Sequence, residues 1–461
     1  MAINEDIENQ ETGDRGVRER LLVPQEKDRA GKDEGTDKGR LWMVYFTTFV
    51  AVCGSYELGT CAGYSSPTQD AIVEELSLST AENSVVQDSL RVLALGFSHI
   101  MDGGRDSKNI CLKMQTMRIA SALCVAGWLA IYFAEGALAL DIRRLATGYG
   151  MGVFSYVLMI VAGVSVSFII GTVLAWRVLA LIGLIPCAVL LFGLFFTPES
   201  PRWLAKTSRE KEFEAALQKL RGKDADISEE AAEIQDYIET LQLLLKANIL
   251  DLFQRRYLSS VIIGVGLMVV QQFGGINGVC FYTSNIFEEA GFSSSVGTIT
   301  YAILQVIATA IVAALVDRAG RKPLLLISGT GLVLGCIVTA LSFFLKVHDL
   351  AADAVPILAV TGILLYIAAF SAGMGAVPWV VMSEIFPINI KGVAGGFATL
   401  VNWFGAWAVS YTFNYLMSWS SYGTFLLYAV INATGMVFVI TVVPETKGRS
   451  LEQIQAAINR E

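Results

Sequence analysis

Three uncharged amide side chains stand close together in one apolar stretch of the sequence. Gln271, Gln272 and Asn277 lie within residues 258–282, which otherwise consist mostly of apolar residues and glycine. An amide both donates and accepts hydrogen bonds, which is what the hydroxyl groups of a neutral polyol require. Three amides in one membrane-spanning helix are costly unless they serve a purpose. The alternative is hydrogen bonding between helices, which accounts well for one of them.

The helix must bend for these amides to act together. Adjacent residues point about 100° apart on a helix, and residues five apart differ by about 140°. Gln272 and Asn277 therefore face different directions on an ideal helix. Glycines at 274, 275 and 278 allow the helix to bend or unwind, so we expect the amides to converge there.

A carboxylate stands in another apolar stretch. Glu57 lies deep within residues 41–63, in the sequence Gly-Ser-Tyr-Glu-Leu-Gly. A buried carboxylate in a membrane is a functional candidate by default. Loss of water disfavours its charged form, so that the group becomes able to take up a proton near neutral pH. A structural ion pair is the alternative interpretation.

The composition indicates that membrane helices position these groups. Of the 461 residues, 54% are hydrophobic and 16% charged, against roughly 25% charged in a soluble domain. With a mean hydropathy of +0.54, the chain is expected to be surrounded largely by lipid. Its net charge of −8 argues against nucleic acid as a partner. The sequence presents no metal-ligand cluster, phosphate loop or nucleophile–base pair, so we expect neither an enzyme nor a cofactor.

Ten stretches are long and apolar enough to cross a bilayer, which takes about 20 residues. They are residues 41–63, 119–139, 148–173, 176–197, 258–282, 297–316, 324–346, 356–382, 393–417 and 422–443. The sequence therefore predicts an all-α polytopic membrane protein. The expected parts are a disordered tail (1–40), an N-terminal membrane half (41–197), a linker of short surface helices (198–256), a C-terminal membrane half (257–443) and a second tail (444–461).

Basic residues set the expected orientation. Lys and Arg are frequent in both tails, in the linker and at 318–322, whereas the loops at 284–296 and 348–355 have none. Because basic loops stay in the cytosol, we expect the linker and both termini on the cytosolic side. Pro-Glu-Ser-Pro-Arg at 198–202 is echoed by Pro-Glu-Thr-Lys-Gly-Arg at 444–449, each after the last span of a half. This repetition indicates an internal duplication, an arrangement that binds substrate between the halves.

Several motifs together resemble one family. The matching segments are 198–202, 271–277, 317–322, 378–379, 383–387, 391–392, 402–403 and 444–449. Residues 317–322 are similar to the Asp-Arg-x-Gly-Arg loop of the major facilitator superfamily, and residues 271–277 to the seventh-helix motif of its sugar porters. The chain most resembles the plant early-responsive-to-dehydration-like monosaccharide transporters. That resemblance implies a major facilitator fold of two helical halves, which carries a monosaccharide such as a hexose by alternating access, as a facilitator or a proton-coupled carrier.

The resemblance also implies a set of sugar-binding residues. They are Gln271, Gln272, Asn277, Gln305, Phe370, Trp379, Asn402 and Trp403. The two tryptophans would present flat apolar faces to the sugar ring, and anchoring at the membrane interface is their alternative role. For Phe370, simple packing is the alternative.

The resemblance further implies that charged residues at the expected cytosolic helix ends form a salt-bridge lattice, which closes the cytosolic side. They are Asp317, Arg318, Arg321, Glu384, Lys391, Glu445 and Arg449. Ordinary snorkelling and anchoring is the alternative. Glu57 and Arg144 match the proton-coupling pair of plant sugar symporters, which makes protons a second expected partner. A structural pair in a passive facilitator is the alternative for these two residues.

The N-terminal half departs from the family pattern. The second helix of the family should lie near 87–117, where this sequence is charged, and the loop between the fourth and fifth helices is missing near 155–165. We therefore expect about 10 spans instead of 12 and an incomplete first half. The alternative function is a truncated splice or gene-model product that is non-transporting or regulatory. The resemblance and the pair Leu21-Leu22 favour the vacuolar membrane over the plasma membrane.

Overall fold

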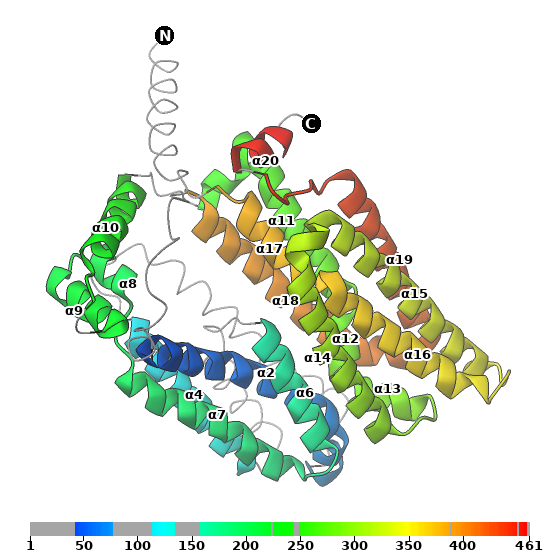
Figure 1. The fold of residues 1–461 in the computed structure, drawn as a ribbon. Coiled ribbons are helices and arrows are strands. Elements are labelled where there is room, and N and C mark those ends of the chain that lie inside the picture. The colour runs from blue at the N-terminus through cyan, green and yellow to red at the C-terminus, as the bar shows by residue number, and fades with distance from the viewer. Residues whose placement is uncertain are drawn as a thin grey trace. The chain divides into compact units, whose positions relative to one another are not determined.

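The described part of the chain is helical throughout. The computed structural model describes residues 42–76, 113–133, 157–222, 225–243, 249–387, 389–449 and 451–458, and each regular element in them is a helix (Figure 1). Seven spans in this part are long and apolar enough to cross a membrane. They are Trp176–Phe196, Arg255–Phe281, Ser294–Val316, Arg321–Val347, Ala354–Ile385, Lys391–Trp419 and Ser421–Thr441. The prediction of an all-α polytopic membrane protein is confirmed.

The C-terminal half contains the six spans that the sequence predicts. Its helices are α11 (Arg255–Phe273), α12 (Ile276–Phe281), α13 (Thr283–Glu289), α14 (Ser294–Ala319), α15 (Arg321–Val347), α16 (Ala354–Ala369), the π-helical η2 (Phe370–Met374), α17 (Val377–Ile385), α18 (Lys391–Trp419) and α19 (Ser421–Thr441). Two spans are broken: α11 with α12 forms one, and α16, η2 and α17 form another. The short η1 (Ile249–Phe253) precedes this half and α20 (Leu451–Ile458) follows it.

Small residues let neighbouring helices of this half approach closely. Helix α15 packs along α16 and α19, and α11 packs along α18 (Figure 1). A Cβ atom on Gly335 of α15 would lie 2.8 Å from the backbone nitrogen of Tyr366 in α16. One on Gly362 would lie 2.3 Å from the hydroxyl oxygen of Thr339. Such contacts are typical of membrane helices, where packing replaces the hydrophobic effect as the force between helices.

Each predicted span of the N-terminal half overlaps a helix, although the ends differ. The helices are α2 (Trp42–Leu76), α4 (Lys113–Tyr132), α6 (Val157–Gly171) and α7 (Trp176–Phe196). Helix α2 continues to Leu76 rather than ending at 63, because its polar residues find acceptors within the protein. The hydroxyl of Thr68 donates to the Tyr64 carbonyl at 2.6 Å, and that of Tyr64 donates to the Trp176 carbonyl at 3.1 Å.

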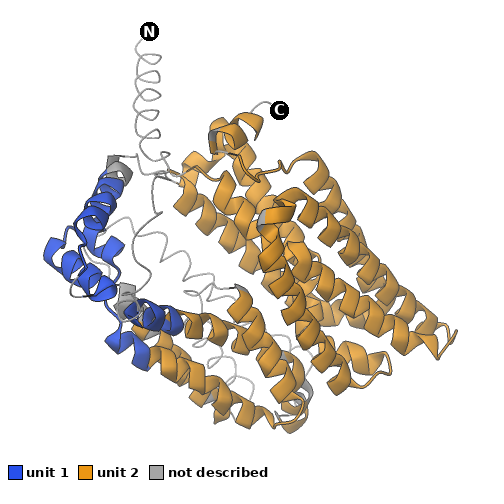
Figure 2. Ribbon diagram, in the orientation of Figure 1, with its two compact units in different colours: residues 1–50, 105–117, 192–247 blue, residues 51–104, 118–191, 248–461 orange. Residues whose placement is uncertain are grey.

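The described residues fall into two compact units (Figure 2). One of them contains α8 (Pro201–Lys206), α9 (Glu210–Arg221) and α10 (Ser228–Leu243), packed around Leu204, Phe213 and Leu217. The sequence predicts such short helices here, and the assignment of 198–256 as a cytosolic linker remains a prediction. The other unit holds most of the membrane helices of both halves.

Candidate functional site

The break between α11 and α12 brings three of the predicted amides into one hydrogen-bonded chain. Asn277 in α12 donates from its side chain to Oε1 of Gln272 in α11. Gln272 in turn donates through Nε2 to Oδ1 of Asn402 in α18 at 2.7 Å. Gln272 is 8% exposed and Asn402 4%, so these two members lie inside the protein. The three hydrogen-bonded side chains are called the amide chain below. The expected bend at the glycines is confirmed, and it is what turns Asn277 toward Gln272.

A left-handed glycine makes this break. Gly275 has a φ of +102°, which an L side chain rarely adopts, and a Cβ there would lie 2.6 Å from the ring of Tyr428. The carbonyl of Gly274 accepts hydrogen bonds from the hydroxyl of Tyr366 and from Nδ2 of Asn432, each at 3.0 Å. Sequence reasoning missed these two donors. The available signal was an asparagine inside the apolar stretch 422–443.

Two further predicted amides each present a buried oxygen. Nε2 of Gln271 donates to the carbonyls of Met374 at 2.6 Å and Gly375 at 3.1 Å, at the end of η2. Its Oε1 has no hydrogen-bond partner in the described protein, and neither has Oε1 of Gln305 in α14. A buried acceptor without a partner is costly, and a hydroxyl group of a ligand would satisfy it.

The predicted aromatic residues lie outside the amide chain. Phe370 opens the π-helical η2, and its ring lies 3.1 Å from a Cβ built on Gly375. Trp379 lies in α17 and Trp403 directly follows Asn402 in α18, and both are partly buried. A π-helical turn often occurs at a functional site. The sugar-binding roles of these three residues remain predictions.

Glu57 is buried near the middle of α2. It is 2% exposed, and its Oε1 has no hydrogen-bond partner in the described protein. The thiols of Cys124 in α4 and Cys187 in α7 approach its carboxyl group. Arg144, the predicted partner, lies outside the described residues, so the pair remains a prediction.

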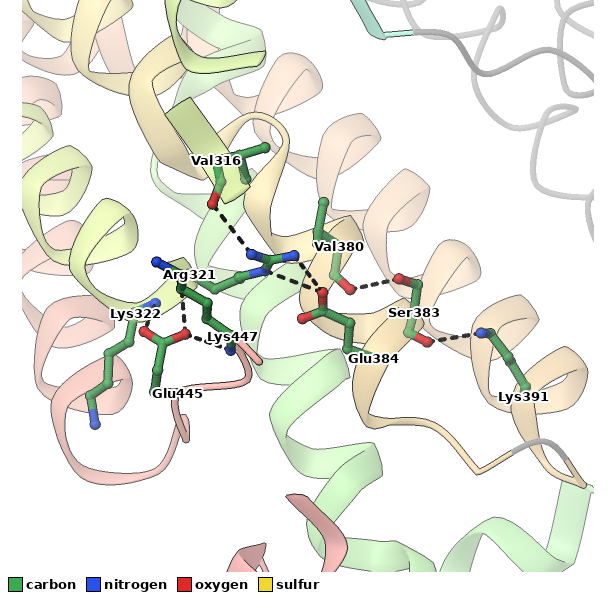
Figure 3. A network of polar contacts seen from close by, with 9 residues as sticks. All are labelled: Val316, Arg321, Lys322, Val380, Ser383, Glu384, Lys391, Glu445 and Lys447. Carbon is green, nitrogen blue, oxygen red and sulfur yellow. Dashed lines mark hydrogen bonds and ion pairs between the residues drawn. The ribbon is translucent and has the colours of Figure 1, made fainter. Parts of the chain in front are cut away.

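The predicted cytosolic helix ends carry a polar network (Figure 3). Arg321, at the start of α15, forms an ion pair with Glu384 of α17, with Nη2 2.8 Å from Oε1. The guanidinium also donates to the Val316 carbonyl at 3.3 Å. Lys391 donates to the carbonyl of Ser383 at 2.8 Å. The network therefore joins the ends of four helices, α14, α15, α17 and α18.

Glu445 caps the N-terminus of α15. Its two carboxylate oxygens accept from the backbone N–H groups of Arg321 and Lys322, each at 3.0 Å, and Oε1 also accepts from that of Lys447 at 2.9 Å. Partial desolvation acts to raise the pKa of the Glu445 carboxyl, but the backbone N–H donors outweigh it and hold this pKa below its usual value. A negative charge is favourable where backbone N–H groups point outward from a helix start.

The other predicted members of the lattice are placed differently. Arg318 and Arg449 are exposed, and the side chain of Asp317 is not among those described. Lys447, which was not predicted, donates to the Arg318 carbonyl at 2.6 Å. Lys447 could have been predicted from its position within the motif at 444–449. In the described part, the network thus combines one side-chain ion pair with bonds from charged side chains to backbone groups.

The fold defines the class of protein. A solved structure of the major facilitator superfamily proton:xylose symporter XylE, bound to 6-bromo-6-deoxy-D-glucose, aligns with a TM-score of 0.67 and 22% identity. The alignment covers 91% of this chain and 99% of that one. The inward open conformation of XylE from E. coli aligns with a TM-score of 0.72 and 22% identity, over 90% and 99%. The chain is a multi-pass membrane protein with the major facilitator fold.

Sequence similarity then gives the family. Residues 155–458 match the family model described as "Sugar (and other) transporter". Sugar transporter ERD6-like 7 of Arabidopsis thaliana is 65% identical over 447 residues, which cover 92% of this chain and 96% of the relative. Sugar transporter ERD6-like 16 of the same plant is 55% identical over 91% of each chain. The chain belongs to the sugar transporter family, so the resemblance seen in the sequence is confirmed, and so is the expectation of a transporter rather than an enzyme.

Proposed function

We propose that this protein carries a monosaccharide across a membrane by alternating access. The observation that carries the proposal is the hydrogen-bonded chain Asn277–Gln272–Asn402, in which Gln272 and Asn402 are buried, together with the partnerless amide oxygens of Gln271 and Gln305. These groups are uncharged donors and acceptors inside an apolar bundle, as a neutral polyol requires. The rings of the predicted tryptophans would cover the apolar face of the sugar.

The relatives support a hexose as substrate. Those at 65% and 55% identity are named sugar transporters, and a solved neighbour with the same fold holds a halogenated glucose derivative. Glucose and its isomers present similar hydroxyl groups, which amide side chains bind without charge selection. We therefore propose hexoses as the substrate class.

Contacts between the two halves support alternating access. The hydroxyl of Ser66 in α2 lies 3.1 Å from that of Ser284 in α13, which lies 3.3 Å from the hydroxyl of Thr298. Ser165 of α6 donates to the Ala302 carbonyl in α14 at 3.0 Å. Ser284 and Thr298 border the loop at 284–296, which carries no Lys or Arg and is therefore expected on the outer side. With the linker in the cytosol, this is the arrangement of a carrier closed on its outer side.

Glu57 supports proton coupling. A buried carboxylate in a membrane helix is able to exchange a proton when the site opens to water. The XylE structure is described as a proton:xylose symporter, which is consistent with a coupled mechanism on this fold. We propose that Glu57, with Arg144, couples sugar to proton movement here, and a passive facilitator is the alternative that the test below separates.

We also propose an orientation and a location for the protein. Both termini and the linker are cytosolic by the distribution of basic residues, and the vacuolar membrane is favoured over the plasma membrane. The halves extend over 41–197 and 257–443, joined by the linker 198–256. Arg321, Glu384 and Glu445 join segments of the C-terminal half to one another, and we propose that they form the C-terminal side of the cytosolic closure that alternates with outer closure.

Uptake of labelled hexose into proteoliposomes, with and without an inwardly directed proton gradient, tests the proposal. The expected result is saturable uptake that unlabelled hexose inhibits by competition. If Glu57 couples protons, the gradient should also stimulate this uptake. Uptake insensitive to the gradient would identify a facilitator. A folded protein without saturable uptake would contradict the proposal.

A truncated, non-transporting product is the second candidate. The family model matches only from residue 155 onward, and most of the segment where the second family helix should lie, residues 87–112, is outside the described residues. Relatives nevertheless align over more than nine-tenths of this chain, which favours the carrier. Sequencing of full-length transcripts distinguishes the two: a longer product carrying the expected second helix would support the truncated form.

A further inference from the structure

Two side chains from different helices hold the break between α11 and α12. The hydroxyl of Tyr366 in α16 and Nδ2 of Asn432 in α19 each donate to the Gly274 carbonyl at 3.0 Å. Both donors are 2% exposed. Asn432 also donates to the Tyr428 carbonyl in its own helix at 2.8 Å, which fixes the direction of its side chain.

These donors meet a specific need of the backbone. Where a helix stops, its last carbonyl groups lose the N–H partners that a continuing helix would supply. Such a group inside an apolar bundle is costly if it has no other donor. Tyr366 and Asn432 supply those donors at Gly274, so they stabilise a break at this position.

The break lies inside the amide chain. Gly274 stands between Gln272 and Asn277, whose side chains are hydrogen-bonded to each other across it. A change in the angle at Gly274 would therefore move Asn277 relative to Gln272 and Asn402. The two donors make their hydrogen bonds to the backbone of Gly274 and not to the amide chain itself.

We propose that Tyr366 and Asn432 are positioning residues for substrate binding, which act by fixing the angle of the α11–α12 break and so the geometry of Gln272 and Asn277. The inference rests on the proposed function, in which these amides are the sugar-binding groups. It adds two residues, from α16 and α19, that the sugar-binding motif does not contain.

The chain offers a matched control one turn from Asn432. Tyr428 is also 2% exposed and packs beside Gly275, but its hydroxyl has no hydrogen-bond partner in the described protein. Tyr366→Phe and Tyr428→Phe thus remove the same atom from two buried tyrosines, and only the first removes a bond to the break. Asn432→Leu repeats the test from α19 at similar side-chain volume.

The first measurement is hydrogen–deuterium exchange of the peptide spanning 270–282 in purified protein. Faster exchange in Tyr366→Phe than in wild type, with no change in Tyr428→Phe, is expected whether or not the protein transports sugar. Equal exchange in wild type and Tyr366→Phe would overturn the proposal. Because this readout does not use transport, an inactive wild type would contradict the proposed function alone.

The second measurement is the KM for hexose uptake. Loss of one buried hydrogen bond predicts a KM increase of about 3- to 10-fold in Tyr366→Phe, with Vmax per folded protein retained. In the double variant Gln272→Asn/Tyr366→Phe, the KM increase should be smaller than the product of the two single increases, because Tyr366 acts in part through Gln272. Multiplied effects would show that Tyr366 acts independently of the amides and would overturn the assignment.

Discussion

The side-chain amide of Asn277 donates a hydrogen bond to Gln272 across a break in one membrane-spanning helix. These residues belong to α12 and α11, and on an uninterrupted helix they would point in different directions. The break thus turns two amides of one span toward a third, Asn402, on another. The candidate binding site is therefore a consequence of backbone geometry as much as of residue type.

The break depends on glycine at 275. Gly275→Ala would combine a φ of +102° with a Cβ 2.6 Å from the Tyr428 ring. We expect a loss of stability of at least about 1–3 kcal/mol, since a strained left-handed residue costs that much. Gly395→Ala in α18 is the control, because a Cβ there meets no atom within 4 Å. Melting temperatures in detergent check this, and equal values for the two variants would contradict it.

The proposed proton coupling assigns the exchanged proton to Glu57. In Glu57→Gln, stimulation of hexose uptake by a pH gradient should disappear, whereas exchange of labelled for unlabelled hexose without a gradient should persist. The reason is that a neutral amide cannot release a proton, although it fills the same space. Glu75→Gln is the control, since Glu75 lies farther along α2 in an exposed pair with Arg177. Retained stimulation in Glu57→Gln would assign coupling to another group.

The network around Glu445 predicts a pH dependence with a definite sign. Because the pKa of its carboxyl lies below the usual value of 4.5, its contribution to stability is full above that value. The contribution is lost as the pH falls through the lowered pKa. Glu445→Gln should therefore melt below wild type at pH 7, by an amount corresponding to about 1 kcal/mol. The two melting temperatures should converge under strongly acidic conditions, and a constant difference at all pH values would refute this.

The proposed closure on the outer side predicts a cross-link between the two halves. The hydroxyls of Ser66 and Ser284 are 3.1 Å apart, so cysteines at both positions should form a disulfide on oxidation. Uptake should then fall to background and return on reduction, because the helices could no longer separate. Oxidised single variants provide the control. Unimpaired uptake by the cross-linked protein would contradict a gate at this place.

Much of the fold could be predicted because a helix that crosses a lipid bilayer needs about 20 apolar residues. The six spans of the C-terminal half follow from apolar length alone, and their predicted ends lie close to those observed. Helix α2 could not be predicted as well, since its polar continuation to Leu76 is stabilised by contacts such as that of Tyr64 with Trp176. A hydropathy pattern ends a span where polar residues begin, whether or not partners satisfy them.

The residue types of the candidate site could be predicted from the sequence, but the residues that stabilise its backbone could not. Gln272 and Asn277 were identified from their amide chemistry and motif, and Asn402 from the family resemblance; the structure joins all three by hydrogen bonds. Tyr366 and Asn432 were not, because their role depends on a carbonyl that is exposed only where the helix breaks. That dependence is a property of the three-dimensional structure, and the spacing of residues along the sequence does not predict it.

Initial rates of labelled-glucose uptake into proteoliposomes, compared between wild type and Gln272→Ala, test the central claim most directly. Thr412→Val, at an exposed position of α18, is the control for any change to a membrane helix. If Gln272 binds sugar hydroxyls, its loss should raise KM by about 10-fold or more, while Thr412→Val stays near wild type. Saturable uptake with an unchanged KM in Gln272→Ala, at equal amounts of folded protein, would contradict the account.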